Sequence, residues 1–182
     1  MPIRKPLIDL LRAYEPIAQR EQLCKQKILA FVQAHSDCFE RSLSIGHVTA
    51  SAWLLNNDHS RALLMHHTKL DKWLQLGGHC DGNPDVLAVA VKEAQEESGI
   101  QEISCVHKDI FDIDIHFLPA SKSHPDHLHY DVRFLLQVIG SETTVGNSES
   151  KELRWITQDR TQLPTNEPSV IAMFDKWISL SS

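Results

Sequence analysis

A glycine turn leads into an acidic helix between residues 77 and 99, and this segment constrains the chain more than any other. Glu93, Glu96 and Glu97 are spaced i, i+3 and i+4, so a helix places their carboxylates on one side. At about 100° per residue, a separate side of the same helix is apolar. That apolar stripe consists of Leu87, Ala90, Val91 and Ala94. The segment therefore predicts a helix that rests on a core and presents an acid cluster beside it.

Start and stop signals for this helix are present at both ends. Asn83 can cap the N-terminus, Pro84 suits the first helical position, and Asp85 favours the positive end of the helix dipole. Gly99 stands where a left-handed residue ends a helix. We therefore expect the helix to begin near Asn83 and to stop at Gly99.

Carboxylates held this close repel one another and raise one another's pKa unless a cation lies between them. Hard divalent ions such as Mg²⁺ prefer oxygen ligands of this kind. The alternative is a solvated acidic face stabilised by i, i+4 pairs, for which Lys92 is the only nearby partner in the sequence. The spacing alone leaves both interpretations open.

The stretch from Gly78 to Ile100 resembles the signature of the Nudix hydrolase superfamily, G-x5-E-x7-R-E-U-x-E-E-x-G-U, where U is aliphatic. Two positions depart from that pattern: Lys92 stands for the arginine, and Pro84 stands for the first glutamate. A proline cannot bind a metal, and the neighbouring acids Asp81 and Asp85 are the candidates to compensate. The resemblance implies an α/β fold, namely an α/β/α sandwich with a mixed sheet.

The same resemblance implies an enzyme that hydrolyses a diphosphate linkage in a small molecule, for example a nucleotide. Its Mg²⁺ or Mn²⁺ would be held by Gly78, Glu93, Glu96 and Glu97. Lys92 would orient a glutamate, although it lacks the bidentate fork of arginine. The candidate general base is a loop acid, Glu149 with Glu152 next, and His127 is a weaker alternative. Further candidates are Lys69, Lys72 and Arg133 for phosphate contacts and Trp73 for stacking on a base.

A second resemblance concerns the segment 47–54 together with Trp73 and Gly78-His79, which is similar to type I isopentenyl diphosphate isomerase, a Nudix-fold enzyme. In that family the histidines matching His47 and His79 bind a metal, together with acids on the strand that here holds His129 and Asp131. The isomerase cysteine, however, is replaced by Gly77. Isomerase-like chemistry is therefore the runner-up function, and a non-catalytic nucleotide-binding module is a further alternative.

Composition restricts the partners of the chain. A net charge of −6 and the lack of a basic run argue against nucleic acid as a partner. The longest apolar run, 86–91, is too short to span a membrane. Cysteines at 24, 38, 80 and 105 show no CxxC pairing, which favours reduced thiols and a cytoplasmic location. The oligomeric state stays open, a homodimer being one option.

Hydrophobic periodicity divides the chain into a helical start and a mixed α/β region. Helices are expected over 5–14 and 17–34, and a closing helix over 167–179. Strands are expected over 47–55, 61–67, 103–107, 110–118, 127–138 and 152–157, and a polar loop over 140–150. We therefore predict a helical extension, residues 1–44, packed on a Nudix domain formed by residues 45–182.

Overall fold

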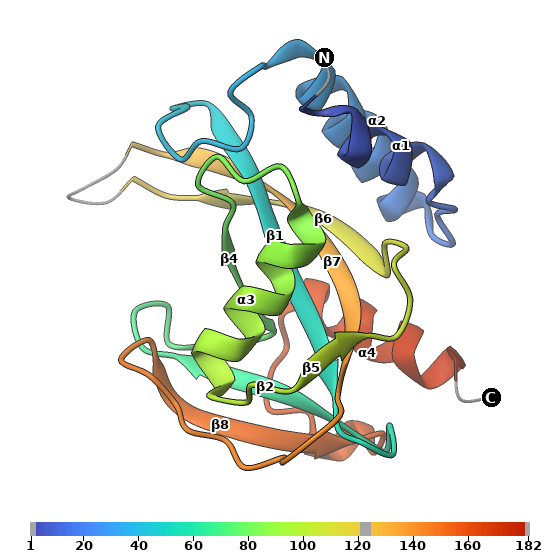
Figure 1. Ribbon diagram of the computed structural model, residues 1–182, viewed down its shortest axis with the longest axis vertical. Coiled ribbons are helices and arrows are strands. Elements are labelled where there is room, and N and C mark those ends of the chain that lie inside the picture. The colour runs from blue at the N-terminus through green and yellow to red at the C-terminus, as the bar shows by residue number, and fades with distance from the viewer. Residues whose placement is uncertain (1–2, 121–124, 181–182) are drawn as a thin grey trace.

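Two helices precede the strands, and two further helices, α3 and α4, follow β4 and β8 in the chain (Figure 1). The computed structural model describes residues 3–120 and 125–180. The elements are α1 (Lys5–Ala13), α2 (Gln19–Ala34), β1 (Gly46–Leu55), β2 (Arg61–His67), β3 (Lys72–Leu74), β4 (Leu76–His79), α3 (Val86–Ser98), β5 (Ile103–Cys105), β6 (Asp112–Leu118), β7 (His127–Val138), β8 (Ser150–Thr157), the 3-10 turn η1 (Arg160–Gln162) and α4 (Pro168–Leu180). Each element predicted from periodicity is present: β2 and β7 have the predicted bounds, and the others differ at one or both ends. The short strands β3 and β4 were not predicted.

The sheet of the described residues is mixed and centred on β1. Strand β1 pairs in parallel with β7 along its whole length, from Gly46 opposite Leu128 to Leu55 opposite Gln137. The other strand pairs are antiparallel. The second edge of β1 is shared, because β4 pairs with residues 49–52 and β2 only with Leu54 and Leu55. The sheet therefore splits beside β1, and β4 runs along the divide.

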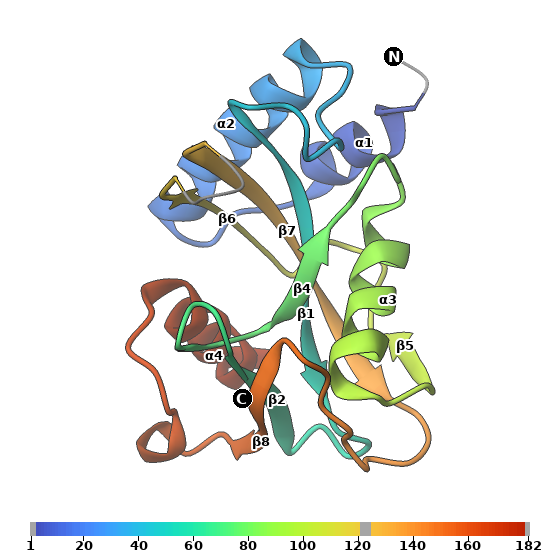
Figure 2. The ribbon, with the colours of Figure 1, turned by 90° about the vertical axis from the view of Figure 1, so that its left-hand side faces the viewer.

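Successive side chains along β1 point to opposite faces of the sheet. Val48, Ala50, Ala52 and Leu54 belong to a core shared with α1, α2 and α3. Trp53 and Leu55 face the other way and pack with Phe174 and Trp177 of α4. Figure 2 shows β1 and β4 between α3 on one side and α4 on the other. The predicted α/β/α sandwich with a mixed sheet is thus confirmed.

Helix α3, the acidic helix, begins later than predicted. Its N-cap is Asp85, whose side chain accepts a hydrogen bond of 3.0 Å from the Ala88 amide, and Asn83 instead accepts one from the Asp85 amide. Pro84 therefore lies outside the helix, where it lines a small hollow with residues of α1. The predicted stop is confirmed, since Gly99 adopts φ 75°. The buried apolar side is also rotated from the predicted stripe, because it is formed by Val86, Val89, Ala90 and Ala94.

Charged side chains connect the N-terminal helices to the sheet and to α4. Lys176 Nζ lies 2.9 Å from both Tyr14 OH and Glu21 Oε2, and 3.3 Å from Asp112 Oδ1. Arg20 of α2 also pairs with Asp112, at 3.0 Å. Asp112 is fully buried, so its charge depends on these partners. The division of the chain at residues 44 and 45 stays a prediction.

Candidate active site

The three signature glutamates lie on one side of α3 but differ in exposure. Glu97 is 3% exposed, the Glu93 side chain 17% and the Glu96 side chain 56%. This gradient arises because α3 rests against β1 and β4 with its Glu97 edge, while Glu96 faces outward. The acids thus share one side of the helix, as the spacing predicts, and the cluster reaches from solvent into the interior.

Glu97 is a buried carboxylate with one hydrogen bond from the protein backbone. The Gly77 amide donates to Glu97 Oε2 at 2.8 Å. Burial, with a smaller contribution from the charges of Glu93 and Glu149, raises the pKa of Glu97 to about 8 even though the Gly77 hydrogen bond acts to lower it. Without a cation nearby, the ionised form of Glu97 is therefore strongly disfavoured.

Glu93 lies directly against the backbone of β4. A methyl group built on Gly78 would be 2.4 Å from Glu93 Oε2, so the glycine leaves room for the carboxylate. Burial raises the pKa of Glu93, an effect that Lys92 opposes. The Gly77-Gly78 pair thus contacts two of the three acids, one through an amide and one through the space left by a missing side chain.

Lys92 pairs with two members of the cluster. Its Nζ lies 3.2 Å from Glu93 Oε1 and 3.1 Å from Glu96 Oε2. The lysine is 59% exposed, so these contacts orient the acids more than they stabilise the fold. Its position matches the role that the signature gives to an arginine.

The β7–β8 loop approaches the same end of α3 and carries Glu149. Asn147 donates a 3.2 Å hydrogen bond to the Glu96 carbonyl, and it accepts one of 2.8 Å from the Glu149 amide. Thr68 donates to the Glu149 carbonyl at 2.8 Å. Glu149 itself is exposed, and its negative charge contributes to the raised pKa values of Glu93 and Glu97. The predicted loop acid is therefore held beside the cluster.

Arg41, a cation that the sequence analysis did not identify, lies in the segment before β1. Its guanidinium binds both oxygens of Asp81, and its pKa is raised first by that hydrogen bond and also by Glu93 and Glu149. Asp81 is thus paired with Arg41, and Asp85 caps α3. Both aspartates therefore have other contacts, and their compensation for the missing signature glutamate stays a prediction.

Four histidines gather on the opposite face of β4. His47 lies opposite His129 in the β1–β7 pair, and His79 lies opposite Thr49 in the β1–β4 pair. The His47 ring centroid is 5.0 Å from those of His79 and His127 and 4.8 Å from that of His129. Burial, together with the neighbouring imidazoles, lowers the pKa of His47 to about 4. Because Gly78 faces Glu93 and strand residues alternate, β4 separates this cluster from the acids.

Two further candidates have structural roles. Arg133 is 1% exposed, with its Nε 2.7 Å from Asp131 Oδ2 and its NH1 2.9 Å from Asp112 Oδ2. It is therefore a buried ion-pair residue and not the phosphate contact predicted from sequence. The Trp73 ring stacks on His66 at 5.0 Å and lies 4.4 Å from the Arg154 guanidinium carbon. These contacts occupy the ring that was expected to meet a base.

Cys80, next to His79, is unsuited to act as a nucleophile. It is 3% exposed, and burial raises the pKa of its thiol, so the thiolate is disfavoured. All four cysteines are free thiols. Within the described ranges, no helix has the length and apolar character needed to cross a membrane.

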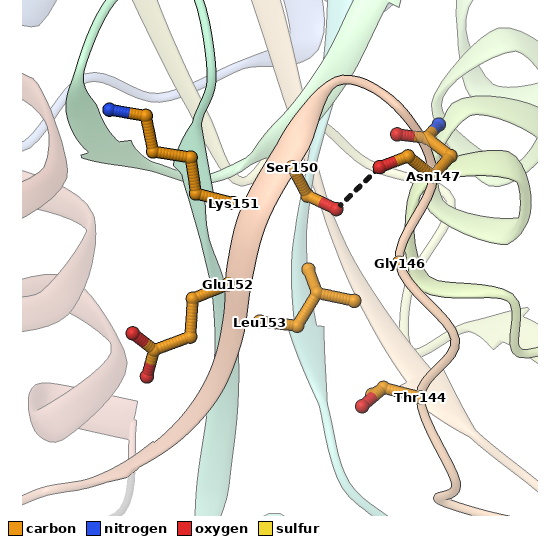
Figure 3. Close-up of a pocket in the computed structure, with 7 residues that line it drawn as sticks. All are labelled: Thr144, Gly146, Asn147, Ser150, Lys151, Glu152 and Leu153. Carbon is orange, nitrogen blue, oxygen red and sulfur yellow. Dashed lines mark hydrogen bonds between the residues drawn. The ribbon is translucent and has the colours of Figure 1, made fainter.

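A hollow of about 320 Å³ lies under the β7–β8 loop (Figure 3). Its lining is formed by Thr144, Gly146, Asn147, Ser150, Lys151, Glu152 and Leu153. The signature glutamates do not line it, although Asn147 links its rim to the Glu96 carbonyl. The hollow therefore adjoins the acid cluster without containing it.

Comparisons with known proteins agree with this geometry. Among solved structures, the chain is similar to a C. elegans Ap4A hydrolase (15% identity, TM-score 0.58, 74% of this chain and 96% of that one). It is also similar to the Nudix hydrolase RenU from M. Smegmatis (20%, 0.54, 75% and 86%) and to the E. coli dihydroneopterin triphosphate pyrophosphohydrolase (13%, 0.55, 73% and 95%). No curated protein sequence matches significantly. Residues 46–177 match the profile described as NUDIX domain, so the chain belongs to the Nudix hydrolase family.

Proposed function

We propose that this protein hydrolyses a diphosphate linkage in a small molecule, with Mg²⁺ or Mn²⁺ held by the glutamates of α3 and the carbonyl of Gly78. The observation that carries the proposal is Glu97, a carboxylate that is 3% exposed and receives one backbone hydrogen bond. A buried acid beside two others is unfavourable unless a cation joins them.

The donor set fits a hard divalent ion. Glu93, Glu96 and Glu97 offer oxygen ligands at one helix face, and Gly78 has no side chain that would compete with Glu93 for space. Histidine nitrogens, which suit softer ions, lie on the other face of β4. When bound, the ion would neutralise the negative charge that protects a diphosphate from attack by water.

The chain's own residues would supply position and proton transfer. Lys92 holds Glu93 and Glu96 in one orientation through its two ion pairs. Glu149, fixed at its backbone by Thr68 and Asn147, would accept the proton of the attacking water as the bridging P–O bond breaks. Arg41 adds a positive charge at the edge of the site, where phosphate oxygens would lie.

The test is the variant Glu97→Gln, assayed with a panel of diphosphates and nucleoside phosphates in Mg²⁺ and in Mn²⁺. We expect hydrolysis to fall by about two orders of magnitude or more, since the substitution keeps size but removes charge. Glu15→Gln, an exposed glutamate between α1 and α2, is the matched control and should keep full activity. Full activity in Glu97→Gln would refute the assignment.

A further inference from the structure

Three imidazoles from the neighbouring strands β1 and β7 converge in a manner suited to ligation. One nitrogen from each of His47, His127 and His129 lies within 4.8 Å of the others. His127 Nε2 and His129 Nε2 are 3.2 Å apart. Two nitrogen ligands of a tetrahedral Zn²⁺, each about 2.0–2.1 Å from the ion, are separated by about 3.4 Å. The spacing of these two nitrogens is therefore close to that of ligands sharing one ion.

The His47 ring is 2% exposed, and neither of its nitrogens makes a well-formed hydrogen bond to a described residue; its interaction with the Leu43 backbone is a minor one among those that shift its pKa. Buried polar groups are nearly always satisfied, and leaving one unpaired costs about 1–3 kcal/mol. A ligand between His47 and its neighbours would remove this penalty. The neighbours of His47 are three imidazoles, whose nitrogen lone pairs can bind a metal ion, and the positive charge of Arg41 that also acts on His47 is paired with Asp81.

The orientation of His127 supports the same conclusion. Its Nδ1 lies 2.8 Å from the Pro125 carbonyl oxygen, so the ring donates there and keeps the lone pair of Nε2 on the side of His129. Histidines that bind metals are commonly oriented by such a hydrogen bond from the second ring nitrogen. His79, with its ring 5.0 Å from that of His47 and 5.1 Å from that of His129, lies where a fourth ligand would come from.

We propose that His47, His127 and His129, with His79 adjacent, bind a divalent transition-metal ion of the Zn²⁺ type at a site distinct from the carboxylates. Neutral imidazoles suit Zn²⁺, Cu²⁺ or Ni²⁺, whereas Mg²⁺ prefers oxygen. The two sites lie on opposite faces of β4, with Gly78 against Glu93 and His79 against His47. The chain would then hold two cations of different chemical class.

The experiment uses the full chain after removal of metals by a chelator. Zn²⁺ is titrated in competition with a chromophoric chelator in the presence of excess Mg²⁺, and Co²⁺ absorption reports nitrogen coordination. We expect Zn²⁺ binding in the wild type, weakened on the order of 100-fold or more in His47→Gln and His127→Gln. His107→Gln, an exposed histidine elsewhere, is the matched control and should bind as the wild type does.

Circular dichroism establishes whether each variant is folded. Because His127 is only partly buried, His127→Gln tests the site even if His47→Gln fails to fold. Glu97→Gln separates this proposal from the proposed hydrolysis, because it should lose hydrolysis and keep Zn²⁺. The histidine site is refuted if the wild type binds no Zn²⁺, if folded His47→Gln and His127→Gln bind it equally well, or if Zn²⁺ is lost with Glu97.

Discussion

Gly78 and Glu93 are packed so closely that a methyl group on the glycine would lie 2.4 Å from Glu93 Oε2. The neighbouring atom is the end of a flexible side chain, so an alanine would displace the carboxylate and leave the backbone in place. The glycine therefore sets the position of one acid of the cluster without contributing a side chain of its own.

We expect Gly78→Ala to lower hydrolysis by about tenfold or more, because a misplaced ligand weakens charge stabilisation in the site. Thermal stability should change little. Gly140→Ala is a matched control, since its new methyl would also meet a flexible glutamate, Glu102, away from α3. Steady-state kinetics and melting curves of both variants provide the check; equal activity of Gly78→Ala and wild type would contradict the arrangement.

Lys92→Gln should reduce activity by about tenfold, because Glu93 and Glu96 lose the cation that orients them. Lys92→Arg should retain activity or raise it, since the guanidinium can bind both carboxylates through separate N–H groups. Lys108→Gln, at an exposed position, serves as control. A Lys92→Gln enzyme with wild-type kcat and KM would show that the two ion pairs have no functional role.

Incubation with isopentenyl diphosphate should give no dimethylallyl product, because Gly77 stands where the isomerase has its cysteine. Gly77→Cys should not create the activity either. Gly77 has φ 155°, and a Cβ there would lie 2.7 Å from Ser51 Cα, so the substitution strains the β1–β4 pair. Product analysis by chromatography tests this, and metal-dependent formation of the isomer by the wild type would promote the runner-up function.

Asp114 should contribute to acid unfolding. Burial acts to raise the pKa of Asp114, but the His116 ring, 3.7 Å away, together with Arg133 and Arg20, lowers it to about 2. Because the pKa of Asp114 is lower in the folded state than its unfolded value of 3.8, the ionised carboxylate stabilises the folded protein at pH values above 3.8. This contribution is lost as the pH falls toward 2. The loss is about 2 kcal/mol over this window.

Denaturant unfolding of Asp114→Asn at several pH values between 2 and 5 measures this contribution. The variant should be less stable than the wild type at pH 5, and the difference should shrink toward pH 2. Asp109→Asn, an exposed aspartate in the preceding loop, should follow the wild-type curve. A constant difference at all pH values would argue against the lowered pKa.

Much of the fold follows from local pattern. Strands β2 and β7 occupy the predicted ranges because alternating or continuous apolar residues specify a strand over many positions. Strands β3 and β4 are too short for periodicity, and Gly77-Gly78 disfavours a strand by propensity. Their structure depends on pairing with β2 and β1, which local sequence does not encode.

The candidate site, too, is predicted from the sequence only in part. The common side of Glu93, Glu96 and Glu97 follows from helix geometry alone, whereas the burial of Glu97 depends on how α3 rests on β4. Alternation predicts that His127 and His129 share a face, but only the parallel register of β1 and β7 brings His47 to them. Arg41 comes from a loop without periodicity, so no sequence signal identifies it.

The ion network around Lys176 has a consequence for how the chain can be divided. A protein shortened to begin at residue 45 would keep the matched profile, but it would lose Arg20, Glu21 and Tyr14. Asp112 would keep Lys176 and Arg133 as partners but would lose Arg20 and the cover of α2, and the lysine would lose two of its acceptors. We therefore expect the N-terminal helices and the sheet to unfold in a single cooperative transition, and a fragment that begins at residue 45 to be less stable than the full chain.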